Sequence, residues 1–350
     1  MGTHAATQSD VARAAGVSRS LVSLALSGSP KVARQTRERI QQVAAELGYR
    51  VNVAASSLAR QSSTIIGLVL PNLRNAFFER LARCLGEAAA ARGLTLFVTV
   101  GAEQPEVLHQ AIESLLGVRV AGIILVSPWL IDDDLLAIAE ETPVCLVGRR
   151  SPGGRVDAVH VDEEAAAGLV VRHLQEQGAQ TIGYVSPRVT DQASRHDREV
   201  ALRRAGTEAG VPVVVQGCGE DAGPAVRQML QVRPEPLGLV IHNDVFAIDA
   251  VPVLREAERQ TRSRVALVSY DNTYLAQREE FSLTSVNQPE EIMAGRAIEL
   301  LCERAGIGGP AAPDAPARTV VLPPELVVRS SSLGREPLTA PATPPTPAPR

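Results

Sequence analysis

The sequence predicts a small all-α head followed by a larger α/β body, and three observations support this fold class. Residues 1–50 carry short amphipathic helical patterns, whereas apolar strand patterns alternate with amphipathic helices after residue 62. At 350 residues the chain is too long for one ordinary core, and its 45% apolar content is ample for folding. The Pro-, Ala- and Thr-rich residues 333–350 show no apolar period, so we expect a disordered tail.

The head contains three helical patterns, and a tight turn joins the first two. Thr7 and Asp10 have the spacing of a capping box. Gly16 permits the turn, and Ser18 can cap the second helix. The expected helices cover about 8–15, 19–26 and 34–48. Two short helices joined by a glycine turn and packed on a third predict a helix-turn-helix, in which the second helix enters the DNA major groove.

The charge distribution favours a nucleic-acid partner for the head. Residues 1–62 hold eight Arg and Lys against three Asp and Glu, a net +5, so the rest of this chain of net charge −4 carries −9. A basic end on an acidic body is typical of a protein that meets a polyanion, although a solvated basic face also explains it. Arg19, Ser20 and Ser23, at the exposed start of the second helix, favour double-stranded DNA over a generic three-helix domain.

The body is predicted to contain parallel sheets covered by helices on both faces. Its strand patterns are almost entirely apolar, and amphipathic helices separate them. The clearest expected strands are 64–71, 121–127, 144–148, 181–186, 238–243 and 265–271, and the expected helices include 105–117, 163–177, 194–209, 223–231 and 245–258. About ten strands are too many for one comfortable sheet, so we expect two doubly wound lobes with a break near Val161.

Several classes of protein are disfavoured. The four cysteines are far apart without metal-ligand spacing, and the motifs GxSxG, GxxxxGK[ST] and HExxH do not occur, so we expect no enzyme, metal or cofactor. The sequence shows no signal-peptide pattern and no apolar run near the ~18 residues that a membrane helix needs. We therefore expect a cytoplasmic, nucleoid-associated protein that has no membrane partner.

Three segments carry a family resemblance, namely DVARAAGVSRSLVSLALSG, TRERIQQVAAELGYRVNVAASSLAR and IIGLVLPNLRNAFF. They resemble the LacI/GalR family of transcriptional repressors, and the resemblance continues to residues 322–332. It implies a homodimer, or a higher oligomer, that binds a near-palindromic operator. It also implies a hinge helix at about Val53–Arg60 and a body of periplasmic-binding-protein type. In the family a hinge leucine wedges into the minor groove, and the matching residue is Leu58; without the resemblance, Leu58 would be read as an ordinary buried residue.

The resemblance also implies domain bounds. These are 1–50 for the helix-turn-helix domain, 51–63 for the hinge helix and linker, 64–332 for the effector-binding and dimerisation domain, and 333–350 for the tail. Lobe one is expected at about 64–160 and 290–318, and lobe two at about 161–287 and 322–332. Crossovers between the lobes are expected near 160–162, 287–290 and 318–322.

The expected DNA-contacting residues are Thr7, Ser18, Arg19, Ser20, Ser23, Leu24, Arg34, Asn52, Ala55 and Leu58. The family usually has Thr at the position of Leu21 and often Arg at that of Leu24, both facing DNA, so Arg19 becomes the strongest candidate for reading a base. Ala33 stands where a capping Ser is common, and Val51 where Pro is usual before the hinge. The operator sequence therefore cannot be transferred from relatives.

The expected ligand site is the cleft beyond the carboxyl ends of the strands. Its candidate residues are Asn75, Phe77, Phe78, Trp129, Gln192, Ser194, Arg198, Asn243, Asp244, Asp271 and Gln288. Carboxylates and amides at strand ends can bond hydroxyls in pairs, which suits sugars and nucleosides, and we expect a carbohydrate. Asp244 could equally cap a helix. Arg195, one turn before Arg198, could replace it, and a solvated basic face explains either arginine as well.

The expected function is allosteric control of transcription, because head, hinge and cleft occur together. A ligand in the cleft would change the relative orientation of the lobes and so the affinity for operator DNA. The sequence does not decide between induction and co-repression. The main alternative is a solute-binding protein that shares the body fold and has no role in transcription.

Overall fold

The computed structural model describes residues 6–26, 29–49, 63–101, 105–128, 130–187, 193–232, 236–261, 265–313 and 315–333. The chain divides into two compact units, residues 1–63 and 64–350. The predicted fold class, an all-α head and two parallel-sheet lobes, is confirmed. No helix among the described residues is long and apolar enough to cross a membrane.

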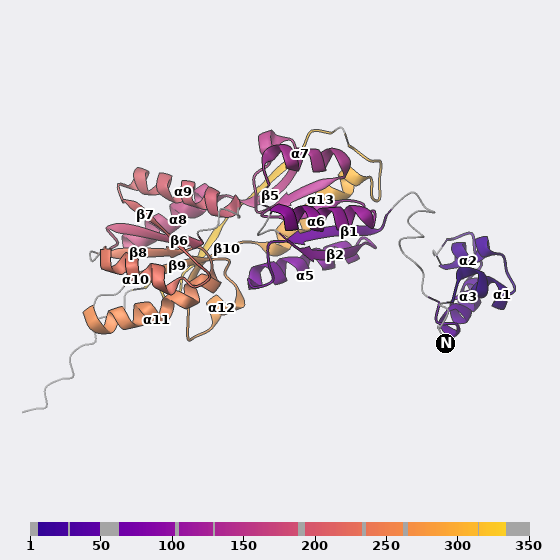
Figure 1. Cartoon of the computed structure of the whole chain (residues 1–350), viewed down its shortest axis with the longest axis horizontal. Helices are drawn as coiled ribbons and strands as arrows, with labels where there is room; N and C mark the ends of the chain where they lie inside the picture. Colours follow the sequence, from indigo (N-terminus) through magenta and orange to yellow (C-terminus); the bar gives the residue numbers. More distant parts are fainter. Residues whose placement is uncertain are drawn as a thin grey trace, which may run out of the picture. The chain divides into compact units, whose positions relative to one another are not determined.

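The described part of the first unit contains the helices α1 (Gln8–Ala14), α2 (Arg19–Leu26) and α3 (Arg34–Glu46) (Figure 1). The capping box is present, since Thr7 Oγ1 accepts from the Asp10 amide and Asp10 accepts from the Thr7 amide. Gly16 adopts φ +63°, a left-handed conformation that suits glycine, between α1 and α2. The domain core consists of Val11, Ala12, Ala15, Val22, Ala25, Val32, Ile40 and Ala44.

The second unit holds two six-stranded sheets, where about ten strands in total were expected. The first sheet has the order β11-β5-β4-β3-β1-β2 and all its neighbours are parallel. Its strands are β1 (Ile65–Leu70), β2 (Thr95–Val100), β3 (Ile123–Val126), β4 (Val144–Val147), β5 (Asp157–Val161) and β11 (Thr319–Leu322). Helices α5 (Ala76–Ala90) and α13 (Glu290–Ala305) share one apolar core with it, and α6 (Pro105–Gly117) and α7 (Asp132–Glu141) share another.

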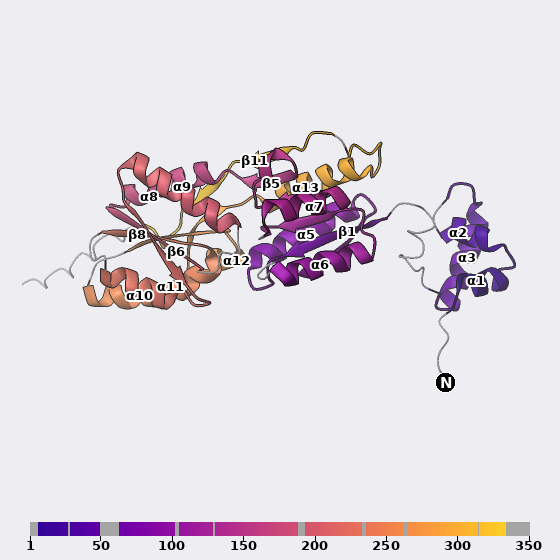
Figure 2. The ribbon, with the colours of Figure 1, turned by 45° about the horizontal axis from the view of Figure 1, so that its top comes forward.

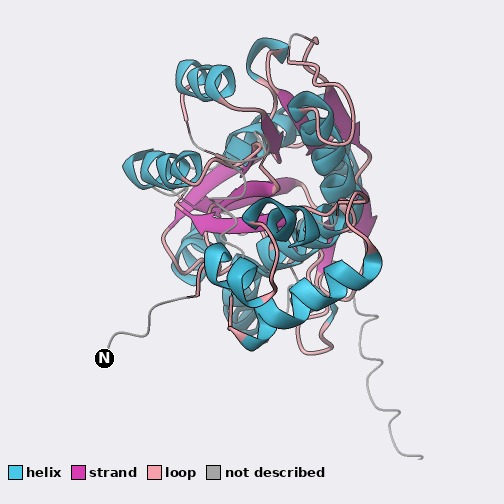
Figure 3. Ribbon diagram, turned by 90° about the vertical axis from the view of Figure 1, so that its right-hand side faces the viewer, coloured by secondary structure: helices cyan, strands magenta, loops and turns pink. Residues whose placement is uncertain are grey.

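The second sheet has the order β12-β10-β9-β8-β6-β7, with only the β10–β12 pair antiparallel. Its strands are β6 (Thr181–Pro187), β7 (Val213–Cys218), β8 (Leu237–Ile241), β9 (Ala266–Tyr270), β10 (Thr284–Asn287) and β12 (Glu325–Val327). Helices α8 (Glu163–Glu176) and α9 (Ala193–Ala209) lie on one face, and α10 (Gly223–Val232) and α11 (Asp244–Thr261) on the other (Figure 2). The short α12 (Tyr274–Gln277) follows β9. Figure 3 distinguishes the helices and strands of the described residues by colour.

The chain crosses between the lobes three times, and the third crossover differs from the prediction. The first two follow β5 and β10. The third falls between Leu322 and Glu325, later than the expected 318–322, because Thr319–Leu322 still pairs in parallel with β5 of the first lobe. The run TVVL is short and follows a Pro-rich stretch, so its strand character was not recognised from the sequence.

Candidate functional site

Four of the ten predicted DNA-contacting residues lie on the exposed side of α2, and a fifth, Ser18, directly precedes the helix. Arg19, Ser20, Ser23 and Leu24 are all exposed, and Ser18 accepts a hydrogen bond from the Leu21 amide at 3.2 Å, which caps the helix. Leu21, which stands where the family usually has a DNA-facing Thr, is half-buried against the core of the head. A leucine here adds apolar contact inside the domain.

The other predicted DNA residues have local partners or lie outside the described residues. Thr7 Oγ1 donates to Asp10 Oδ2 at 2.6 Å, so Thr7 shapes the start of α1. Arg34 is exposed and pairs with Glu38 at 2.8 Å along α3, a contact that is worth little in water. Ala33 makes no side-chain cap to α3, as expected. Asn52, Ala55, Leu58 and the expected hinge helix lie outside the described residues.

A cavity of about 40 Å³ lies between the lobes of the body, at the carboxyl ends of the strands. Eight of the eleven predicted cleft residues line it, namely Asn75, Phe77, Phe78, Ser194, Arg198, Asn243, Asp271 and Gln288. Phe77 and Phe78 form an edge-to-face pair with ring centroids 5.6 Å apart. Trp129 and Gln192 lie outside the described residues. The fold therefore brings together residues that are more than 200 positions apart in the sequence.

Asp271 lies at the centre of this site. Its Oδ2 accepts from Asn75 Nδ2 at 2.7 Å, and its Oδ1 accepts from Gln288 Nε2 at 2.6 Å. Burial, together with repulsion from Asp244, raises the pKa of Asp271 to about 7, although Arg198 and both amides oppose the shift. The backbone of Asp271 has φ +95°, a conformation that is costly for a residue with a Cβ and that is often found at functional sites.

Arg198 is the buried cation of the cleft. Its guanidinium donates to Glu163 at 3.0 Å and to the His242 carbonyl at 2.6 Å, and it lies 3.6 Å from the centroid of the Tyr270 ring. Burial alone would lower the pKa of Arg198, but attraction from Glu163 and Tyr270 outweighs it and raises the pKa. Burial, with repulsion from Arg198, holds the pKa of His242 well below its usual value, so this imidazole is neutral.

Asp244 does not line the cavity, which corrects its assignment to the cleft. It is fully buried and accepts from Ser269 Oγ, Ser285 Oγ and both the amide and the hydroxyl of Thr273. Burial raises its pKa, although these donors oppose the shift. The helix α11 is instead capped by Asn243, whose Oδ1 accepts from the Phe246 amide at 3.1 Å. Asp244 thus fastens β9, β10 and the loop after β9 together behind the site.

Arg195 does not take the place of Arg198. Its guanidinium contacts Ser186 Oγ at 3.2 Å and Glu199 at 3.3 Å, and it is absent from the residues that line the cavity. One turn of α9 separates the two arginines, and only Arg198 of the two lines the cavity. The solvated-face interpretation fails for Arg198, whose residue is 3% exposed.

Several polar, charged or glycine residues that line the cavity were not predicted from the sequence. These are Ser127, Gly148, Arg150, His160, Glu163, Asp197 and His242. Ser127 and Gly148 directly follow β3 and β4, so the strand-end rule applied to all strands could have found them. Gly148 has φ +72°, and a Cβ there would lie 2.8 Å from Ser127 Oγ, so glycine is required. Arg150 and Asp197 face each other across the cleft at 3.9 Å, a pairing that the sequence does not show.

The described residues contain no cluster of three or more His, Cys, Asp or Glu that could hold a metal ion. The four cysteines are all buried, and none of them forms a disulfide. The arrangement can therefore offer polar and aromatic contacts to a small molecule, while α2 offers exposed polar side chains to a macromolecule. An exposed recognition helix and a polar interlobe cleft on one chain define a ligand-responsive DNA-binding regulator.

Comparisons with known proteins agree with this class. Residues 7–52 match the family described as bacterial regulatory proteins, lacI family, and residues 171–332 match a periplasmic binding protein-like domain. The chain is 30% identical to the HTH-type transcriptional regulator GalS of Salmonella typhimurium, over 85% of this chain and 89% of GalS. It is 32% identical to the maltose regulon regulatory protein MalI of Escherichia coli, over 72% and 76% of the two chains.

Among solved structures, the complex of the transcriptional regulator CelR with cellobiose covers 93% of this chain and 99% of its own, with 27% identity and a TM-score of 0.67. The chain belongs to the LacI family of DNA-binding transcriptional regulators.

Proposed function

We propose that this protein binds a near-palindromic operator as a homodimer, represses transcription there, and responds to a neutral, polyhydroxylated effector in the interlobe cleft. A carbohydrate is the expected class of effector. The protein would act in the cytoplasm, on nucleoid DNA. Effector binding would shift the relative orientation of the lobes, by no more than its differential affinity for the two arrangements allows.

The pairing of charges in the cleft carries the proposal for a neutral effector. Both arginines that line the described cavity have carboxylate partners, Arg198 with Glu163 at 3.0 Å and Arg150 with Asp197 at 3.9 Å. An anionic ligand would have to compete with these carboxylates for the guanidinium groups. The remaining polar groups include the amides of Asn75, Asn243 and Gln288 and the hydroxyls of Ser127 and Ser194, which match sugar hydroxyls. CelR, whose structure contains cellobiose, has the same body architecture.

The edge strand β2 supports a homodimer. It lies at the end of the first sheet and exposes Phe97 by 40%, Val98 by 50% and Val100 by 39%. An exposed apolar edge strand is unfavourable in a monomer unless another chain covers it. A second copy of this chain would bury the strand by two-fold symmetry, and a two-fold dimer with one recognition helix per subunit reads a palindromic site.

The DNA part is tested by selecting operator sequences from a random duplex library with the full-length protein. We expect one near-palindromic consensus, with affinity that falls steeply as salt rises because Lys and Arg displace condensed counterions. Absence of any enriched sequence would favour the alternative, a solute-binding protein without a transcriptional role.

The effector part is tested by thermal-shift measurements with neutral sugars, their sugar-phosphate and uronate counterparts, and nucleosides. The proposal expects stabilisation by one or more neutral sugars and none by the anionic counterparts. Stabilisation by a uronate or a sugar phosphate alone would contradict the argument from charge pairing. Repeating the operator titration with the stabilising sugar then separates release of DNA from tighter binding.

A further inference from the structure

Asn75 makes two hydrogen bonds that lead to opposite lobes. Its Oδ1 accepts from the Phe77 amide at 3.0 Å and thereby caps α5 of the first lobe. Its Nδ2 donates to Asp271 Oδ2 at 2.7 Å, at the end of β9 in the second lobe. The residue is 6% exposed, so water competes weakly for either bond. One amide side chain thus joins the start of a helix in one lobe to a buried carboxyl group in the other.

Both oxygens of Asp271 are occupied by the protein's own amides. Gln288 Nε2 takes Oδ1 at 2.6 Å, in addition to the Asn75 contact on Oδ2. A sugar that binds Asp271 through two adjacent hydroxyls needs these same two acceptors. Gln288 lies on a crossover between the lobes and can follow either one, whereas Asn75 is fixed to the first lobe by its cap on α5. Displacement of Asn75 therefore separates groups that belong to different lobes.

Among the described residues, two ion pairs also cross between the lobes. Arg150 and Asp197 are 3.9 Å apart, and Arg74 and Glu220 are 3.3 Å apart. The Arg74 and Glu220 side chains are 62% and 86% exposed, so solvent screens that pair. The buried Asn75–Asp271 bond is consequently the strongest candidate for holding the lobes together.

We propose that Asn75 is a latch between the lobes, and that a cleft ligand binds by replacing its Nδ2 on Asp271 with a hydroxyl donor. The ligand then has to carry a hydrogen-bond donor at this position, because a carboxylate or phosphate oxygen cannot donate to Asp271. The inference rests on the proposed function only for the nature of the ligand. When the ligand displaces Nδ2 from Asp271, Oδ1 still accepts from the Phe77 amide and caps α5. Asn75 therefore stays with the first lobe, whose strand β1 directly follows the head and its linker.

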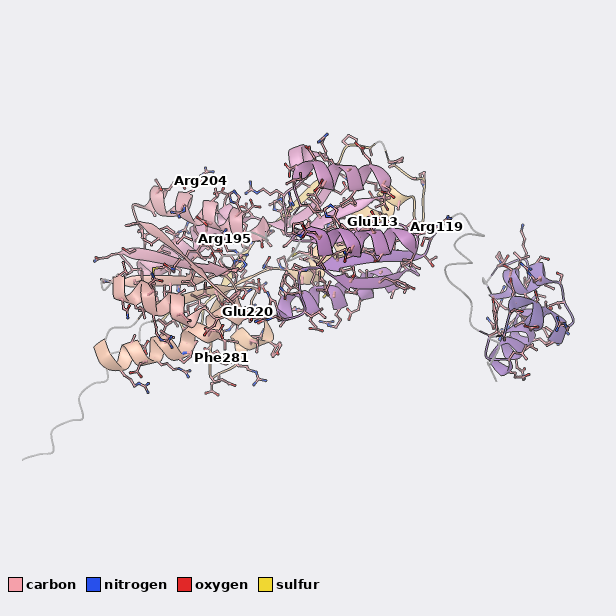
Figure 4. All side chains as sticks on the ribbon, viewed as in Figure 1. Glu113, Arg119, Arg195, Arg204, Glu220 and Phe281 are labelled. Carbon is pink, nitrogen blue, oxygen red and sulfur yellow. The ribbon has the colours of Figure 1, made fainter. Side chains whose placement is uncertain are left out.

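The test compares Asn75→Ser with the wild-type full-length chain. Serine can still cap α5 but is too short to reach Asp271. Spin labels on cysteines introduced at Glu113 of α6 and Arg204 of α9, both exposed and labelled in Figure 4, report the interlobe distance. Mixing labelled with excess unlabelled chain suppresses distances between subunits. Without added sugar, we expect a narrow distance distribution for the wild type and a broader, longer one for Asn75→Ser.

A matched control changes the N-cap of a different helix, α8, which lies next to a crossover between the lobes. Asp162 caps α8 by accepting from the Ala165 amide at 3.0 Å and does not line the cavity, so Asp162→Ser should leave the wild-type distribution unchanged. Identical distributions for Asn75→Ser and the wild type would overturn the latch. Equal broadening in both variants would also overturn it, because any cap change would then loosen the body.

Titrations with D-galactose and with cellobiose separate this inference from the proposed function. If a sugar binds, Asn75→Ser should bind it roughly tenfold more tightly, since a larger fraction of the protein is competent to bind. Weaker binding by Asn75→Ser would show that Asn75 holds the ligand and would contradict the displacement. If the distances broaden but neither these sugars nor any neutral sugar of the thermal-shift series binds, the latch stands and the proposed effector class fails. If a sugar binds while the distances stay unchanged, the latch fails and the effector class stands.

Discussion

The head and the cleft use their functional side chains in opposite ways. On α2, Arg19, Ser20 and Ser23 are exposed and form part of the surface of the head. In the cleft, Arg198 is 3% exposed and Asp271 is 4% exposed, and both are hydrogen-bonded to other protein groups. Substitution in the head should therefore change affinity with little effect on folding. Substitution in the cleft should change both affinity and folding stability, because replacing one partner of a hydrogen bond leaves the other buried group unsatisfied.

The largest effect is expected for Arg198→Met. This variant leaves Glu163 without its buried partner, and removing one member of a buried ion pair costs about 3–5 kcal/mol. Urea unfolding of the full chain should show this loss, together with loss of the sugar response in thermal-shift measurements. Arg195→Met is the matched control, since Arg195 is one turn away and 20% exposed, and its loss should be about 1 kcal/mol or less. Equal losses of unfolding free energy in the two variants would contradict the claim that the buried Arg198 contributes more to stability than Arg195.

The next effect is a pH dependence that comes from Asp271. Its pKa is raised from 3.8 to about 7, so the folded chain holds a proton that the unfolded chain has released between these pH values. The contribution of this group to stability is therefore present below about pH 4 and is lost as pH rises through 7, by up to about 4 kcal/mol.

The measurement is the free energy of unfolding of the wild type and of Asp271→Asn, each between pH 4 and pH 8. The difference between wild type and variant should decline as pH rises. Taking this difference removes the contribution of His242, which both proteins share. The lowered pKa of His242 decreases the free energy of unfolding as pH falls, which is opposite to the effect of Asp271. A pH-independent difference would show that the carboxyl group is already ionised throughout this range.

A smaller effect is expected in the head, where Arg19→Ala should weaken binding to the selected operator by about 1–3 kcal/mol and relax sequence preference at one base pair. The comparison variant is Arg34→Ala, on the exposed side of α3. It should weaken binding to all sequences equally and reduce the salt slope. Thermal unfolding of Arg19→Ala should match the wild type. A uniform loss of affinity in Arg19→Ala would make it a backbone contact and leave base reading to other residues.

The smallest effect is a gain of stability in the head. Ala33 precedes α3 without a side-chain cap, in an extended conformation that serine also adopts. Ala33→Ser should stabilise the head by about 1 kcal/mol, measured by hydrogen exchange of the α3 amides in the full chain. Ala14→Ser makes the same chemical change at the last residue of α1, where no N-cap is missing, and should give a small loss. A gain in both variants would point to a cause other than capping.

Local patterns determined much of the fold from the sequence. The capping box at Thr7, the turn at Gly16 and the cap at Ser18 each depend on residues within four positions of each other, and the structure contains all three. The alternation of apolar strands and amphipathic helices likewise predicted the two lobes, because both periodicities are local. The short strand β11 was missed because its existence depends on pairing with β5, about 160 positions earlier.

The sequence by itself determined the family, the candidate recognition residues of α2 and eight of the 18 residues that line the cleft, since each of these follows a motif or lies near the end of a strand. Only the tertiary structure decided how these residues are paired. It moved Asp244 out of the cleft, chose Arg198 over Arg195, and joined Asn75 to Asp271 across 196 positions. The physical reason is that burial and hydrogen-bond partners depend on which chain segments meet, and no local pattern records that meeting.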